Sequence, residues 1–177
     1  VLARQIARER RSLNDLRARL AADPPPFRAP GTAVFMASNP DGVPRALWHN
    51  LVYNNVLHER VILITIITEE VPRVSATRRL DITEILPGIV RVVARSGFME
   101  TPSVTEILYE AGRQGVRYNP SDSTFFVGAE SVFFERSALK AWEKRLFAFL
   151  MRNSRRAASF YGVPERRLVE FGTRLGV

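Results

Sequence analysis

Residues 31–68, GTAVFMASNPDGVPRALWHNLVYNNVLHERVILITIIT, contain one complete strand, helix, strand unit and decide the fold. Residues 33–37 form a short apolar run that suits a strand buried on both faces. Residues 61–67 are too apolar and too rich in β-branched side chains for a half-exposed strand. A right-handed crossover through the helical stretch between them would make the two strands parallel, and we expect that arrangement.

The segments between these strands carry the signals of a turn and of the two ends of a helix. Residues 39–42, Asn-Pro-Asp-Gly, suit a turn in which the glycine is free to take a positive φ. Pro44 suits the first helical position, where its missing N–H has no helical partner. Leu47 and Leu51 are four residues apart and share one helical face. Residues 54–55, Asn-Asn, can end the helix in left-handed geometry.

The rest of the chain predicts further elements of the same α/β kind. We expect a hairpin at 82–94, a helix that begins near Ser103 and stops at Gly115, a second hairpin at 125–134, a long helix at 138–153 and a last strand at 168–171. The predicted fold class is α/β, with a mixed sheet begun by the βαβ parallel pair, later strands added as hairpins, and helices packed on the sheet. The strand order stays open.

The first 22 residues predict an amphipathic helix. Its apolar residues recur at sevenfold spacing and in the companion positions: Leu2, Ile6, Leu13, Leu16 and Leu20. This helix either packs on its own domain or forms a stalk that pairs with a second copy. Residues 23–30 are rich in proline and predict an extended spacer. We therefore divide the chain into a membrane-proximal helix and linker at 1–30 and an α/β domain at 31–177.

The composition narrows the class of protein. A chain of 177 residues that is 46% hydrophobic suits one compact domain with a real core. No apolar run reaches the roughly 18 residues that a membrane helix needs, so we expect this piece to be soluble. The chain has no cysteine, which excludes disulfides, cysteine zinc sites and thiol nucleophiles.

The net charge of +8, from 26 basic and 18 acidic residues, raises nucleic acid as a partner. The arginines gather at 4–19, at 152–156 and at 166–167, and the aromatic residues are not interleaved with them as a stacking platform. Positive charge beside the cytosolic face of a membrane is the other explanation, and we favour it. A freestanding basic α/β module that binds nucleic acid remains the alternative.

No catalytic arrangement is visible in the sequence. His49 and His58 are the only histidines, and nothing places them together, so we expect no metal site. No serine stands in a nucleophile elbow, and neither glycine-rich phosphate loop is present. We expect neither an enzyme nor a cofactor.

One candidate ligand site follows from the parallel pair. In open α/β sheets, ligands bind beyond the carboxyl ends of the parallel strands. The residues at those ends are Ser38, Asn39, Asp41 and Gly42 after the first strand, and Thr68 and Glu69 after the second. The helix N-terminus beside them would favour an anion, whereas their carboxylates would repel one. Turn and capping chemistry explains the same residues without a ligand.

Several stretches also resemble one known family. The chain contains, in the family's order, GTAVFMAS at 31–38, GVPRALWHNL at 42–51, NNVLHERVI at 54–62, GFME at 97–100 and TFFVG at 124–128. This order is similar to that in the cytosolic C-terminal domain of the bacterial Kup transporters, the KUP/HAK-type low-affinity potassium uptake permeases. The chain departs from the pattern at Ser96, where an aromatic residue is usual.

The resemblance implies a noncatalytic cytosolic domain on the cytoplasmic side of the cell inner membrane. Its partner would be the transmembrane part of the same transporter, which would take up K⁺ together with H⁺. The domain would serve assembly or regulation. A homodimer, formed through the N-terminal helix or an exposed sheet edge, and a cyclic dinucleotide bound at the strand ends are further expectations.

Overall fold

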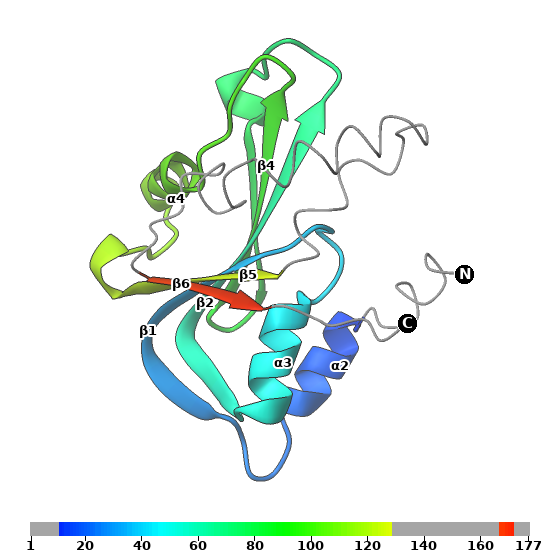
Figure 1. Ribbon diagram of the computed structural model, residues 1–177, viewed down its shortest axis with the longest axis vertical. Coiled ribbons are helices and arrows are strands. Elements are labelled where there is room, and N and C mark those ends of the chain that lie inside the picture. Colours follow the sequence, from blue (N-terminus) through cyan, green and yellow to red (C-terminus); the bar gives the residue numbers. More distant parts are fainter. Residues whose placement is uncertain (1–10, 129–166, 172–177) are drawn as a thin grey trace, which may run out of the picture.

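The computed structural model describes residues 11–128 and 167–171 (Figure 1). The helices in these ranges are α2 (Leu13–Leu20), α3 (Arg45–Tyr53) and α4 (Val104–Arg113), with short 3-10 turns η1 (Ala76–Arg78) and η2 (Pro120–Asp122). The strands are β1 (Phe27–Met36), β2 (Val56–Glu69), β3 (Leu80–Leu86), β4 (Ile89–Gly97), β5 (Ser123–Gly128) and β6 (Leu168–Phe171).

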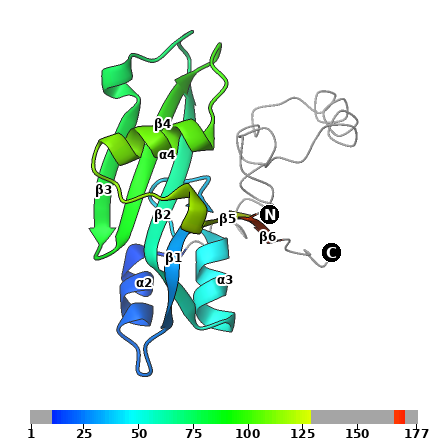
Figure 2. The same ribbon diagram turned by 90° about the vertical axis from the view of Figure 1, so that its left-hand side faces the viewer.

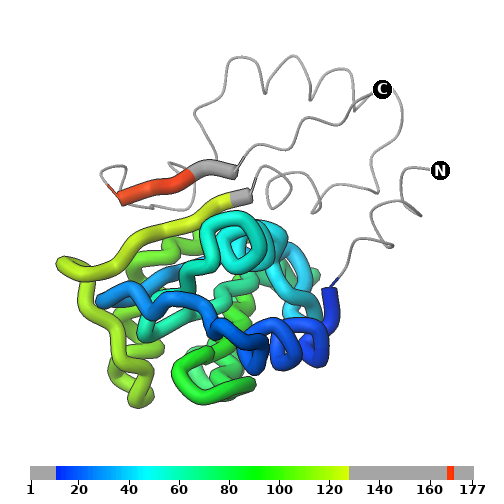
Figure 3. Tube along the Cα trace, turned by 90° about the horizontal axis from the view of Figure 1, so that it is seen from below, coloured from blue at the N-terminus to red at the C-terminus, as the bar shows by residue number. Residues whose placement is uncertain are grey.

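The strands form one mixed sheet in the order β3-β4-β2-β1-β5-β6. The predicted α/β class, the parallel β1–β2 pair and the β3–β4 hairpin are confirmed. The later strands β5 and β6 join differently from the prediction, because β5 pairs in parallel with β1 and β6 in parallel with β5. Figure 3 shows β6 beside β5 at the edge of the sheet. The predicted strand at 132–134 and helix at 138–153 lie outside the described residues.

The central strands are buried on both faces, as their composition predicts. Ala33, Val34 and Phe35 of β1 have no exposed surface, and residues 61–65 of β2 are also buried. The helix between them begins after Pro44, and Asn55 follows it with a φ of 52°, the left-handed conformation that asparagine tolerates. The sequence therefore specified this unit correctly at both ends.

Helices cover both faces of the sheet. On one face, α4 packs its buried residues against alternate residues of β1, β2, β4 and β5, and Figure 2 shows α4 lying over the sheet. On the other face, α2 and α3 cover the remaining set, which includes Phe35 and Phe126 with their rings stacked 4.5 Å apart. The structure is thus a three-layer α/β domain.

The N-terminal helix differs from its prediction. A new helix begins after Ser12, whose hydroxyl accepts the Asp15 N–H while the Asp15 carboxylate accepts the Ser12 N–H. This reciprocal pair starts α2 within the stretch that the sequence predicted as one helix. Leu16 is fully buried in the core under α2, with Leu13 and Leu20 packed against the same core, whereas Leu2 and Ile6 lie outside the described residues.

The proline-rich segment is also partly regular structure. Strand β1 already begins at Phe27, whose N–H donates to the Asn55 carbonyl. Residues 27–30, predicted as spacer, are therefore part of the sheet, and α2 packs on the core that the sheet forms. The domain boundary at residue 30 stays a prediction.

The packing of α2 can be tested with Leu16→Ala. Because Leu16 is fully buried, we expect the substitution to lower the free energy of unfolding by about 2–5 kcal/mol. The control is Asn14→Ala on the exposed side of the same helix, with an expected change within about 0.5 kcal/mol. Denaturant unfolding at several protein concentrations measures both. An effect of Leu16→Ala seen only at high protein concentration would show that Leu16 packs in a dimer instead.

Candidate functional site

Strands β2 and β4 run past the end of β1. The last β1–β2 pair is Met36 with Ile64, whereas the β2–β4 pairing continues to Glu69 with Gly97. At about 3.3 Å per residue, the ends of β2 and β4 project roughly 16 Å beyond the end of β1. Residues 70–79 and 98–103 and helix α4 surround these projecting ends (Figure 1).

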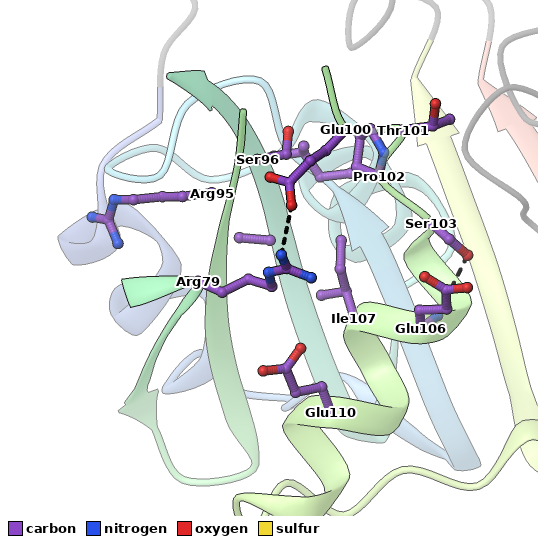
Figure 4. Close-up of a pocket in the computed structure, with 12 residues that line it drawn as sticks. Arg79, Arg95, Ser96, Glu100, Thr101, Pro102, Ser103, Glu106, Ile107 and Glu110 are labelled. Carbon is purple, nitrogen blue, oxygen red and sulfur yellow. Dashed lines mark hydrogen bonds and ion pairs between the residues drawn. The ribbon is translucent and has the colours of Figure 1, made fainter. Parts of the chain in front are cut away.

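A pocket of about 100 Å³ lies between the projecting ends and α4 (Figure 4). Since one water takes about 30 Å³ of liquid volume, the pocket has room for a few waters or one small chemical group. Its polar and apolar lining includes Ile66, Arg79, Ser96, Glu100, Glu106 and Glu110. This pocket lies beyond the carboxyl ends of two parallel strands, the general place for ligands in such sheets, but the strands are β2 and β4 rather than β1 and β2.

The Glu100 carboxylate joins the two loops beside the pocket. Its Oε2 accepts the N–H of Gly97 at 2.7 Å and the N–H of Val74 at 3.1 Å, and its Oε1 accepts from Arg79 Nη2 at 2.6 Å. The Gly97 N–H lowers the pKa of Glu100, and the Val74 N–H and the positive charge of Arg79 lower it further. The ionised carboxylate therefore stabilises the contact between residues 70–79 and the end of β4.

Gly97 is required where the two loops meet. A Cβ atom at Gly97 would overlap the backbone carbonyls of Val71 and Pro72. The same carbonyls accept the N–H groups of Phe98, at 2.9 Å, and Met99, at 3.2 Å. The loops thus touch through their backbones, which only glycine permits at this position.

The charges around the pocket favour neither sign of ligand. Arg79 comes from the segment before β3, whereas Glu106 and Glu110 come from α4 (Figure 4). Ser96 Oγ and Arg79 Nε are buried without a protein hydrogen-bond partner, which suits ordered water or a small polar ligand. In residues 11–128 and 167–171, no group of three or more His, Cys, Asp or Glu side chains is placed to hold a metal ion.

The structure places the first four predicted ligand residues in a turn after β1. Asn39 Oδ1 accepts the Asp41 N–H at 3.0 Å, and the Gly42 N–H reaches the Asn39 carbonyl at 3.5 Å, while Ser38 is exposed. The exposed Asp41 carboxylate lies 3.8 Å from Arg91 Nη1. These contacts are the turn chemistry that the sequence offered as the alternative explanation.

The other two predicted ligand residues lie further along β2. Thr68 is exposed, and the Glu69 carboxylate lies 3.5 Å from both Arg78 and Arg95. Because β1 ends at the level of Ile64, the structure does not bring this half of the predicted site level with the turn after β1. Ligand binding at the six residues stays a prediction.

The two histidines lie on different elements. His49 is on α3, where its ring contacts Tyr53 with 5.4 Å between centroids. His58 is on β2 and packs edge-on against Phe126 at 5.8 Å. Burial lowers the pKa of His58, because the charged imidazolium would lose water contacts.

Arginines that raised the nucleic-acid alternative take part in packing α2. Arg11 lies over the Trp48 ring at 5.1 Å, and Arg19 donates to the Leu51 carbonyl and to Asn55 Oδ1. These guanidinium groups are engaged with α3 and the residues that follow it. The arginines at 4–10 and 152–156 lie outside the described residues.

Sequence reasoning missed both the pocket and the role of Glu100. Residues 102–106 were interpreted only as a helix start, which is confirmed, because Ser103 Oγ accepts the Glu106 N–H. The available signal was Gly97 at the end of a strand followed three residues later by Glu100. A glycine in that position indicates a close approach of two backbones.

Comparison with known proteins identifies the family. A family model described as "K+ potassium transporter C-terminal domain" matches residues 30–177. Proteins named "Probable potassium transport system protein Kup" are 42% identical over 86% of this chain in Myxococcus xanthus and 36% identical over 100% of it in Bdellovibrio bacteriovorus. A Kup 3 protein of Bradyrhizobium diazoefficiens is 45% identical over 85% of the chain.

These matches and the fold agree on a class, an α/β domain of a potassium transport protein. The chain belongs to the family of potassium transporter C-terminal domains. It covers 24%, 27% and 25% of the three relatives, so it spans about a quarter of their length. No solved structure matches the chain. Among the described helices, none has the length and apolar character needed to cross a membrane.

The role of Glu100 predicts a specific dependence of stability on pH. Its pKa in the folded protein is below its ordinary value, so its contribution is complete above the unfolded pKa and is lost as the pH falls through the folded pKa. We expect Glu100→Gln to lower Tm by several degrees at neutral pH and to flatten the loss of Tm on acidification. Thermal unfolding from pH 7 to about pH 3 measures this.

The matched control is Glu110→Gln, which changes a second carboxylate of the same pocket. It should leave the acid dependence unchanged. If Glu100→Gln lost stability on acidification as steeply as the unmodified chain, the proposed contribution of the ionised carboxylate would be refuted.

Proposed function

We propose that this chain is the cytosolic, noncatalytic domain of a Kup-type transporter whose membrane part takes up K⁺ together with H⁺. The observation that carries the proposal is the family match over residues 30–177, together with relatives named as potassium transport proteins. About three quarters of each relative lies outside the matched region, which leaves ample length for a membrane part.

The domain's own role would be assembly or regulation. Its sheet is covered on both faces and would move as a rigid body, so a ligand or a second copy that binds it differently in two states would shift the transporter between them. A homodimer fits this role. Because Leu16 is buried in its own domain, an exposed sheet edge such as β3 is a better contact surface than the apolar face of α2.

Potassium uptake tests the regulatory role. In cells without other K⁺ uptake systems, we expect the transporter with Val34→Asp in this domain to change its rate or its apparent K⁺ affinity by about fivefold or more, the lower range of allosteric coupling. Val34 is fully buried, so aspartate there disrupts the core. The control is Val52→Asp on the exposed side of α3.

The same assay also tests the coupled ion. Addition of K⁺ should acidify the cytosol if H⁺ enters with it. Equal uptake by the transporter with Val34→Asp and by the unmodified transporter, at equal amounts in the membrane, would argue against a regulatory domain.

Binding of a cyclic dinucleotide to Ser38, Asn39, Asp41, Gly42, Thr68 and Glu69 is a separate prediction. It is motivated by the carboxyl ends of β1 and β2 and by the N-terminus of α3. Titration calorimetry with cyclic adenine and guanine dinucleotides should give a heat of binding, and a ligand at about 100 times its Kd should add about 2.7 kcal/mol to the free energy of unfolding. No heat and no thermal shift would leave these residues as an ordinary turn and strand end.

A further inference from the structure

Exposed apolar side chains gather at one end of the molecule. Val71, Phe98 and Met99 expose 39%, 60% and 67% of their surface, and they make up three of the eight large hydrophobic residues exposed in the described ranges. Together with Pro72 they form what we call the apolar tip. The loops that carry it lie at the top of Figure 1, at one end of the longest axis.

The apolar tip is a built structure rather than a pair of loose loops. Its two halves are joined by backbone hydrogen bonds from Phe98 to the Val71 carbonyl and from Met99 to the Pro72 carbonyl. Behind it, Glu100 holds the Val74 and Gly97 N–H groups and the Arg79 guanidinium. The fold therefore holds these apolar side chains toward solvent although their burial would be favourable, which marks an interaction surface.

The charges around the apolar tip are arranged to present arginine. Arg73 and Arg78 are exposed on the loop that carries Val71. The carboxylate of Glu69 lies between Arg78 and Arg95, and that of Glu100 is bonded to Arg79, so both of these acidic groups are already engaged. The whole chain carries a net charge of +8, which is complementary to an anionic surface.

We propose that the apolar tip inserts into the headgroup region of an anionic phospholipid bilayer. Phe98 and Met99 would enter the boundary between headgroups and acyl chains, and Arg73 and Arg78 would lay their apolar stems along it with the guanidinium groups among the phosphates. A projecting apolar end ringed by arginine suits this surface better than a protein groove. The presence of a membrane beside the domain rests on the proposed function.

Cosedimentation with vesicles tests this proposal on the chain itself. The chain should bind vesicles of phosphatidylglycerol and phosphatidylethanolamine, and bind less to phosphatidylcholine vesicles. The double variant Phe98→Ser/Met99→Ser should bind the anionic vesicles at least about tenfold more weakly, given the transfer free energy of two apolar side chains. Arg73→Gln should weaken binding to the anionic vesicles and reduce its salt dependence.

Two matched controls separate the tip from general stickiness and general charge. Tyr53→Ser removes a side chain that is 77% exposed at the end of α3, and Arg117→Gln removes an exposed arginine after α4. Both should bind like the unmodified chain. All four variants change exposed side chains, so each should keep its unfolding midpoint.

Three results would overturn the proposal. They are no cosedimentation of the unmodified chain with anionic vesicles, undiminished binding by Phe98→Ser/Met99→Ser, and an equal loss of binding on Tyr53→Ser. None of these would change the expected result of the K⁺ uptake assay, so failure of the tip proposal and failure of the proposed function are distinguishable.

Discussion

The ends of β2 and β4 extend beyond β1, and the Glu100 carboxylate ties together the backbone around them. For about five residues these strands lack the neighbour that pairs them lower in the sheet, and the chain then turns into two separate loops. Backbone N–H groups that leave a sheet in a partly buried place need other acceptors. Glu100 supplies one carboxylate to the N–H groups of Gly97 and Val74, and Arg79 balances its charge.

Two features of the molecule depend on this arrangement and lie on either side of it. On the inner side, the segment that leads from Glu100 to α4 leaves the small pocket in which Ser96 Oγ has no protein partner. On the outer side, the close backbone contact at Gly97 directs Phe98 and Met99 into solvent. The same hydrogen bonds therefore support a polar cavity and an exposed apolar surface at the end of the sheet that is distant from the start of β1.

Local signals predicted the local structure, whereas distant pairings were beyond them. The unit at 31–68 was readable because its strands are apolar throughout and Asn55 can take the left-handed conformation that ends α3. The start of α2 was missed because the sevenfold spacing hid the capping box at Ser12. The parallel pairing of β5 with β1 and the pocket beside Glu100 were not predictable, since both depend on strand register and order, which no short motif encodes.

The most direct test of the central claim is amide hydrogen exchange at Gly97 and Val74. If the Glu100 carboxylate holds both N–H groups, they should exchange slowly, close to the rates of the β4 amides that pair within the sheet, although exposed residues surround them. In the Glu100→Ala variant both should exchange much faster. Exchange of the two amides in the unmodified chain at the rate of the exposed Thr77 amide would contradict the account.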